Sequence, residues 1–171
     1  MQTPRLVGEN KGTQETATLA GKYLTFALGQ EQFGIGILKI KEIIGMMPIN
    51  ELPQTPPFIK GVINLRGTVI PVTDLRLKFG LESMEYSDRT CIIVVEMEKD
   101  SGSLIMGLVV DAVSEVATIK NEEIETTPNL GIQAHLNFIQ GMAKLANGVK
   151  ILLDIDRVLA EDHLSALKEM F

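Results

Sequence analysis

Apolar residues in this chain gather in short runs, rich in valine, isoleucine and phenylalanine, that are separated by glycine and polar residues. Runs of this kind predict strands, and the breaks between them predict turns. Several runs come in neighbouring pairs around a turn, which favours hairpins. The sequence therefore predicts an all-β fold. The expected strand pairs are 23–28 with 32–45, 61–65 with 68–72, 90–97 with 104–119, and 138–145 with 149–155.

Prolines and capping residues indicate where these strands end. The segment 46–58 holds four prolines, which exclude a helix interior or a central strand and favour an extended surface connector. Pro71 predicts that the strand 68–72 lies at a sheet edge or carries a bulge. Thr73 or Asp74 can cap the short helical turn that follows, because a side-chain oxygen there can accept from free backbone amides.

The two ends of the chain differ in pattern. Residues 1–21 are rich in threonine, glycine, glutamine and glutamate without any period, which predicts a flexible N-terminal tail. Residues 22–171 form the expected folded domain. Its last segment, 157–171, spaces apolar residues near the 3.6 period of a surface helix, so a C-terminal helix is expected.

The chain contains an internal repeat. Residues 58–74 (FIKGVINLRGTVIPVTD) match 138–154 (FIQGMAKLANGVKILLD) at a displacement of 80 positions, with six identities. About one identity is expected by chance in such a window. Upstream, residues 33–43 match 106–116 at a displacement of 73, with a glycine, a glutamate and four apolar positions in common. Two copies of one structural unit are therefore expected.

A repeat of about 75 residues with roughly five short strands in each copy predicts two small barrels related by a pseudo-twofold axis. Closing a sheet removes exposed edges that would otherwise aggregate. The predicted architecture is all-β, with two pseudo-symmetric barrels of roughly five strands each, a few short helices and a C-terminal helix. Barrel one is expected from 22–50 with 138–160, and barrel two from 58–120, and the copies are free to exchange strands.

Positions that differ between the copies are candidates for function, because positions shared by both copies serve the fold. Arg66, at the tip of a predicted hairpin, lies opposite Ala146, and Asn64 lies opposite Lys144. Gly67 can take the positive φ that the turn requires. The repeat leaves open the alternative that Arg66 is an exposed turn residue without a role.

Composition and charge exclude several partners. The net charge of −6 and a pI near 5.0 oppose binding to nucleic acid, which requires a basic surface. Cys91 is the only cysteine, so an intrachain disulfide is impossible and a reducing compartment is favoured. No signal peptide and no apolar stretch near the ~18 residues of a membrane span are expected. The chain is interpreted as cytoplasmic.

Candidate chemistry is sparse. His135 and His163 have no cysteine or carboxylate at metal-ligand spacing, and no glycine-rich loop is built to hold a nucleotide phosphate, so neither a metal nor a cofactor is expected. Cys91 lies in the apolar run TCIIVV and is interpreted as a buried core residue rather than a nucleophile. A small enzyme using Cys91 or an acidic pair remains the weaker alternative to a binding module.

Three stretches, FALGQEQFGIGILKIKEI, FIKGVINLRGTVIPVTDLRLKFG and GLVVDAVSEV, resemble the CheW family of bacterial chemotaxis coupling proteins. The resemblance spans about residues 22–160. It implies a pair of intertwined, five-stranded, SH3-like barrels and a non-enzymatic adaptor. Such an adaptor joins the cytoplasmic tip of chemoreceptors, a helical hairpin, to the regulatory domain of the histidine kinase CheA. It also implies recruitment to membrane-associated receptor arrays without insertion into the membrane.

The resemblance also assigns candidate contacts. The expected kinase-binding residues, Met47 and Ile49, rest only on their apolar character in an exposed connector. The alternative function is a CheW-like scaffold for a kinase pathway other than flagellar chemotaxis. The expected receptor-binding residues are Ile40, Glu42, Ile43, Asn64, Arg66, Val113 and Val116.

Overall fold

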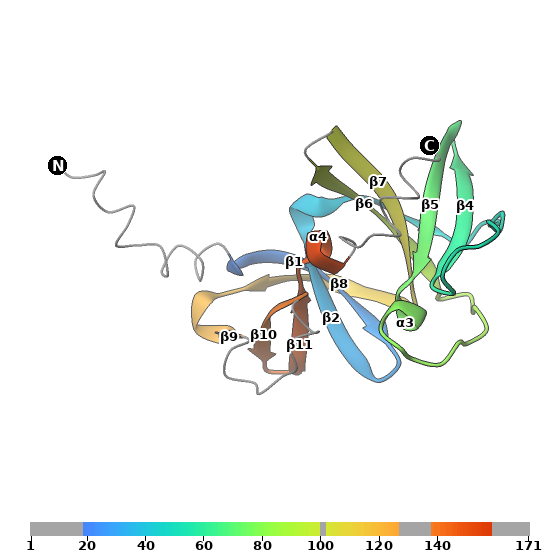
Figure 1. Ribbon diagram of the computed structural model, residues 1–171. Helices are drawn as coiled ribbons and strands as arrows, with labels where there is room; N and C mark the ends of the chain where they lie inside the picture. The colour runs from blue at the N-terminus through green and yellow to red at the C-terminus, as the bar shows by residue number, and fades with distance from the viewer. Residues whose placement is uncertain (1–18, 100–101, 127–137, 159–171) are drawn as a thin grey trace.

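The computed structural model describes residues 19–99, 102–126 and 138–158, which form two curved sheets with very little helix (Figure 1). The predicted all-β fold is confirmed. Barrel one contains, in spatial order, β8 (Ala112–Ile119), β1 (Gly21–Leu28), β2 (Glu31–Gly36), β11 (Gly148–Leu153), β10 (Ile139–Leu145) and β9 (Ile124–Thr126). Barrel two contains β3 (Ile40–Gly45), β6 (Cys91–Lys99), β7 (Gly102–Val110), β5 (Thr68–Asp74) and β4 (Ile59–Leu65). The helical elements are α3 (Leu75–Lys78), α4 (Ile155–Val158) and the short 3-10 helices η1 (Ile37–Lys39) and η2 (Asn121–Glu123).

The two copies are intertwined, as predicted. The hairpin β1–β2 of the first copy lies in barrel one with β10 and β11 of the second copy, and β2 pairs with β11 in parallel. Likewise, the hairpin β6–β7 lies in barrel two with β4 and β5, and β5 pairs with β7 in parallel. Each barrel therefore needs strands from both halves of the sequence.

Two strands depart from the predicted grouping of 22–50 with 138–160 and of 58–120. β3 follows β2 in the chain but pairs with β6 in barrel two, and β8 follows β7 but pairs with β1 in barrel one. The grouping is wrong for these two strands because each one crosses over and becomes an edge strand of the other barrel's sheet.

The hydrogen-bond register supports the pseudo-twofold relation in detail. A bulge interrupts the pairing of β4 with β5 between Ile59 and Gly61, and an equivalent bulge interrupts β10 and β11 between Ile139 and Gly141. The pairings of β3 with β6 and of β8 with β1 carry matching irregularities as well. Positions displaced by 80 or 73 residues therefore occupy equivalent places in the two barrels.

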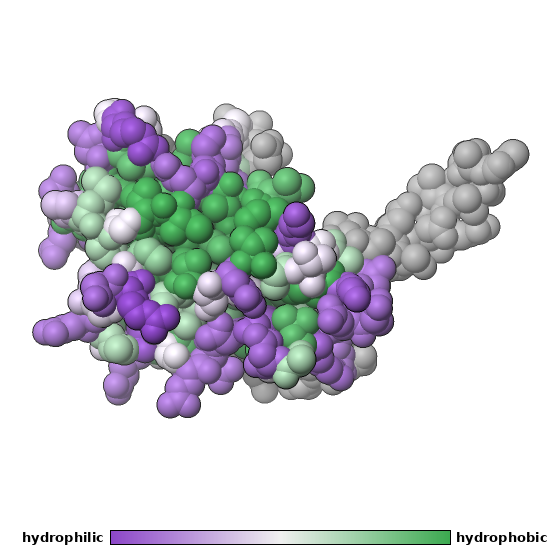
Figure 2. All heavy atoms as spheres, turned by 180° about the vertical axis from the view of Figure 1, so that it is seen from behind, coloured by the Kyte–Doolittle hydropathy of each residue, from purple (hydrophilic) through white to green (hydrophobic). Residues whose placement is uncertain are grey.

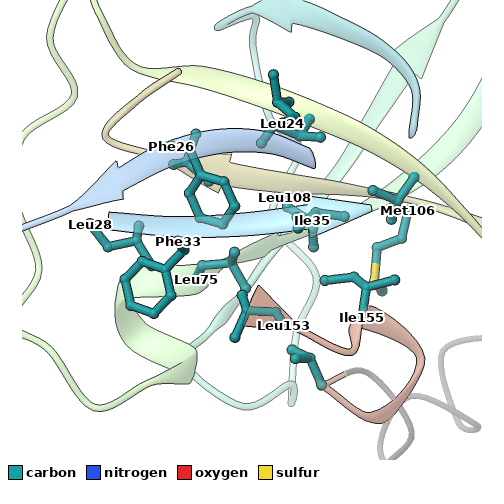
Figure 3. Close-up of a cluster of buried hydrophobic side chains, with 14 of the residues drawn as sticks. Leu24, Phe26, Leu28, Phe33, Ile35, Leu75, Met106, Leu108, Leu153 and Ile155 are labelled. Atoms are coloured by element: carbon teal, nitrogen blue, oxygen red, sulfur yellow. The ribbon is translucent and has the colours of Figure 1, made fainter. Parts of the chain in front are cut away.

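The main hydrophobic core lies between the barrels and is shared by both copies (Figure 3). Most of its buried members form equivalent pairs, one from each copy, and all of them belong to one cluster. In β1 and β6 the equivalent positions are 69 residues apart, because Phe26 pairs with Phe33 as Val95 pairs with Met106. The pairs are Leu24 with Ile93, Phe26 with Val95, Leu28 with Met97, Phe33 with Met106, Ile35 with Leu108, Ile59 with Ile139, and Leu75 with Ile155. Burying this set gives about 2 kcal/mol per large side chain, and neither copy can obtain it alone.

Each barrel also has a small interior of its own, and these two interiors differ. Barrel two is filled by aliphatic side chains, Ile63, Ile70, Val72, Ile92, Val94 and Val109. The interior of barrel one is smaller and contains Tyr23, Ile119, Ala143 and Leu152.

The polar residues that the copies share serve the fold. The Asp74 side chain accepts from the Leu77 amide at 3.4 Å and caps α3, which confirms one of the two predicted caps. In the second copy, the Asp154 side chain accepts from the Arg157 amide at 3.3 Å. The backbone amides of both aspartates donate to equivalent carbonyls, those of Phe58 and Phe138.

Pro71 predicted an edge strand or a bulge: the edge position of β5 is wrong, whereas the pairing of β5 with β4 does carry a bulge, between Ile59 and Gly61. β5 lies between β4 and β7, and Pro71 pairs with Val62 of β4. The sheet tolerates this proline because the pairing of β5 with β7 begins only at Val72. The predicted tail 1–21 and C-terminal helix 157–171 lie almost entirely outside the described residues.

Both copies have a glycine at the position of Gly61 and Gly141, because the backbone passes close to it in each copy. A Cβ on Gly61 would lie 2.0 Å from the carbonyl oxygen of Asn50, and the φ of Gly61 is 141°. A Cβ on Gly141 would lie 2.9 Å from the Glu125 carbonyl oxygen. The connector therefore crosses close to the glycine in both copies.

We expect Gly61→Ala to lower the free energy of unfolding by at least about 3 kcal/mol, because the methyl group collides with backbone in a conformation that alanine rarely adopts. Urea unfolding followed by circular dichroism measures the change. Gly45→Ala in β3 is the matched control, since its Cβ would meet nothing within 4 Å. Equal stability of the two variants would contradict the close crossing.

Candidate functional site

A groove opens at one end of barrel two. It has a volume of about 230 Å³, and β3 forms one wall while the β4–β5 hairpin forms the opposite one. The floor is aliphatic, and the charged groups lie at the rim. The lining residues are Lys41, Glu42, Leu65, Arg66, Thr68, Ile70, Val94 and Ile105.

The hairpin tip holds Arg66 in an unusual conformation. Arg66 has a φ of 51° and Gly67 a φ of 91°, so both central residues of the turn are left-handed. Among the described residues, Gln54 is the one other non-glycine with a positive φ. The Asn64 side chain stabilises the turn, because its Oδ1 accepts from the Gly67 amide at 2.8 Å. Asn64 thus orders the turn that presents Arg66.

Arg66 forms an ion pair with Glu42 across the mouth of the groove. The pair joins the hairpin tip to β3, the strand at the opposite edge of the sheet, and it brings together two residues that are 24 positions apart. The side chains are 69% and 33% exposed, so the pair contributes little to folding, about 0–1 kcal/mol. Both charged groups remain accessible to a partner.

Exposed apolar residues form an equivalent pair on the two exchanged strands. Ile43 of β3 is 44% exposed and its counterpart, Val116 of β8, is 52% exposed. Ile40 and Val113 are only partly buried but pack against the shared core, so they support these strands from below. From behind the view of Figure 1, hydrophobic residues gather in a broad patch bordered by hydrophilic ones (Figure 2).

Cys91 connects the two exchanged strands. It opens β6 opposite Gly45 of β3, and its thiol has a hydrogen bond with the Val113 backbone of β8. Burial raises the pKa of this thiol, and the Val113 contact only partly offsets the rise. A raised pKa keeps the thiol protonated at neutral pH, which disfavours a nucleophilic role.

The predicted kinase contacts lie on the connector after β3. Met47 and Ile49 are half-buried and pack against the interior of barrel two, together with Met46 and Ile44. They are therefore partly structural, with their remaining surface available beside barrel two.

Sequence reasoning missed the groove floor. Leu65, Ile70, Val94 and Ile105 line the groove with Arg66 but come from four different strands. Leu65 could have been found from its place beside Arg66 in the hairpin. Ile70 lies in the same hairpin, whereas Val94 and Ile105 share no sequence pattern with Arg66, because only the fold of the sheet brings them together.

No three potential metal ligands gather anywhere in the part of the chain that the structure describes. None of the helices in that part combines the length and the apolar character that a bilayer crossing requires.

The fold and groove define a class: a duplicated, two-barrel β-protein whose exposed features suit protein docking. A family model described as CheW-like domain matches residues 22–163, and the chain belongs to this family of chemotaxis coupling and scaffold proteins. The predicted fold class, two intertwined SH3-like barrels, is confirmed. The likeness extends to a solved structure: the crystal structure of the scaffolding protein TtCheW from Thermoanaerobacter tengcongensis superimposes with a TM-score of 0.74 and 33% identity, covering 85% of this chain and 96% of that one.

Two relatives of known family support the same assignment to the CheW family. The chain is 36% identical over 148 residues to the chemotaxis protein CheW of Klebsiella aerogenes, which covers 86% of this chain and 87% of that protein. It is 31% identical over 157 residues to the chemotaxis protein CheW of Rhizobium meliloti, with 87% and 99% covered.

Because the left-handed conformation costs an arginine about 1 kcal/mol or more, we expect Arg66→Gly to be more stable than Arg66→Ala by roughly that amount. Both variants lose the pair with Glu42, so the backbone alone separates them. Urea unfolding of the two proteins measures the difference. Equal midpoints would show that the turn relaxes to a negative φ.

Proposed function

We propose that this protein is a non-enzymatic chemotaxis adaptor that couples the signalling tips of transmembrane chemoreceptors to the regulatory domain of a CheA-type histidine kinase. The observation that carries the proposal is the groove of barrel two, where the Arg66–Glu42 pair lies at the rim of an aliphatic floor. The family membership supports the same role.

The receptor tip is a helical hairpin in the proposed complex, and the groove suits a helix. A helix presents apolar side chains at i, i+3, i+4 and i+7, and such side chains can pack on Ile43 and Val116 and enter the aliphatic groove. Arg66, already at the rim, can exchange its contact with Glu42 for a receptor carboxylate or a helix-end carbonyl. Asn64 acts indirectly by ordering the turn, and Ile40 and Val113 act by supporting their strands.

The kinase contact is proposed on the connector that carries Met47 and Ile49. Both side chains pack on the interior of barrel two and keep part of their surface exposed. Methionine adapts its shape to a partner, which suits a docking surface. With receptor and kinase on separate surfaces, the protein acts by holding both in a fixed relation, at membrane-associated receptor arrays in the cytoplasm.

We expect Ile43→Asp to weaken capture of a receptor signalling fragment at least tenfold, because a carboxylate replaces an apolar anchor. We expect Arg66→His to weaken capture with a melting temperature within a few degrees of the parent, because the turn side chain is exposed. Isothermal titration and thermal unfolding measure the two quantities. Leu81→Asp, at a residue 39% exposed on another loop, is the control. Unchanged capture by both site variants would remove the receptor assignment.

For the kinase, we expect Met47→Asp to reduce binding of the CheA regulatory domain while receptor capture stays within twofold of the parent. A charged group on the connector disrupts an apolar contact without reaching the groove. Pull-down with each partner in parallel separates the two effects. Loss of both partners together, with a lowered melting temperature, would show that Met47 is only a structural residue.

A further inference from the structure

A second groove opens on barrel one, where β1 begins and β2 and β11 end. It has a volume of about 400 Å³ and shares no lining residue with the groove of barrel two. Leu38 of η1 forms part of its wall and is 98% exposed, more than any other large hydrophobic side chain in the described part of the chain. A large apolar side chain left open to solvent beside a groove indicates a docking surface.

The matching place on barrel two is a cavity of only about 50 Å³. It matches the barrel-one groove because equivalent residues of the two copies line both. The pairs are Asp74 with Asp154, Thr90 with Gly21, Val109 with Gly36, and Asp111 with Leu38. The same place in the two copies is therefore open in one and nearly closed in the other.

The loop 81–90, which precedes β6, occupies the barrel-two cavity. Its residues 84–87 line the cavity, and the Tyr86 hydroxyl donates to Asp74 Oδ2 at 2.9 Å. The ammonium of Lys60 lies 5.8 Å from the centroid of the Tyr86 ring, and Gln140, the counterpart of Lys60, lines the barrel-one groove. Barrel two thus shows what this place accepts, an aromatic ring whose hydroxyl reaches the aspartate.

The segment that precedes β1 cannot supply such a ring. It is the counterpart of the loop 81–90, but the sequence has Ala17 at the position that matches Tyr86. Residues 1–18 contain no aromatic residue at all. The barrel-one groove therefore has the lining of a tyrosine site, and the equivalent segment of this chain has no tyrosine for it.

Asp154 can receive a hydroxyl as Asp74 does. One oxygen of each aspartate accepts from a backbone amide of the helical turn that follows it. The second oxygen of Asp74 accepts from Tyr86, whereas the second oxygen of Asp154 lies 3.5 Å from Arg157 Nε. That contact is long and the Arg157 side chain is 63% exposed, so the oxygen can accept a shorter hydrogen bond from a partner.

The barrel-one groove also carries cations that the barrel-two cavity lacks. Lys22 and Lys39 line it at the positions of Cys91 and Ala112. Lys39 pairs with Asp156 at 2.7 Å, and Lys22 is exposed. Ammonium groups at the rim of an apolar groove favour a partner with carboxylates.

We propose that the barrel-one groove is a docking site for an acidic, tyrosine-bearing peptide segment of a partner protein. The ring packs beside Leu38, its hydroxyl donates to Asp154, and a neighbouring carboxylate pairs with Lys22. The loop 81–90 is the template, because Glu85 precedes Tyr86 in it. This inference goes beyond the proposed coupling of receptor and kinase and does not rest on it.

The test uses the full chain and a synthetic peptide with blocked ends that copies residues 81–90, LESMEYSDRT. Isothermal titration should show saturable binding with a dissociation constant below about 1 mM. The peptide with Tyr86→Ala should bind at least tenfold more weakly, because the ring and its hydroxyl supply most of the contact.

Variants of the protein locate the binding. Leu38→Asp and Lys22→Glu should each weaken binding at least fivefold, and salt should reduce the effect of Lys22→Glu. Both side chains are exposed, so the melting temperature should stay within a few degrees of the parent. Val149→Asp is the matched control, because Val149 is 49% exposed but lies four residues along β11 from Leu153 of the groove, roughly 13 Å away. It should leave the affinity within twofold.

Three results would overturn the proposal. A folded parent without saturable binding would show that the groove takes no such segment. Equal affinities of the parent and Leu38→Asp would place the peptide elsewhere on the surface. A parent dimer that Leu38→Asp converts to a monomer, measured by size-exclusion chromatography with light scattering, would identify a second copy of the chain as the occupant instead.

Discussion

The structure depends on the packing of two equivalent sets of core residues against each other. Leu24 is equivalent to Ile93, Phe33 to Met106, and Ile59 to Ile139. All six side chains belong to one cluster between the barrels. Because the largest buried surface is the one that the copies share, the barrels are held in one relative position. Any two surfaces on opposite barrels therefore keep a fixed separation, which an adaptor requires.

The interior and the ends of each barrel do not have to pack against the other copy. At these places the residues of the two copies differ. Barrel two keeps an aliphatic interior, a groove and an arginine held in a strained turn. Barrel one has Ala143, Thr25 and Lys150 at the matching places. Shared positions such as Gly61 and Gly141 explain how the chain folds, whereas positions that differ between the copies point to what it binds.

The sequence predicted those features that depend on local pattern or on the repeat. The hairpins, the cap at Asp74 and the pseudo-twofold relation follow from turn residues and identities. The exchange of β3 and β8 could not be predicted, because alternation in IKEIIG indicates a strand without naming its partner. The contact of Arg66 with Glu42 depends on that exchange. The repeat alignment places Lys150 opposite Ile70, so the sequence shows that the copies differ there. Only the structure shows that Lys150 is buried.

The crossing of β3 and β8 has a consequence for origin as well as for shape. Two identical half-length chains could close this architecture only by swapping strands, as a homodimer whose symmetry makes both ends the same. A peptide link between the halves lifts that equality, since a mutation then alters one end and spares the other. An asymmetric coupler, whose two ends are lined by different residues, is a form that the fused chain can reach and a symmetric homodimer cannot.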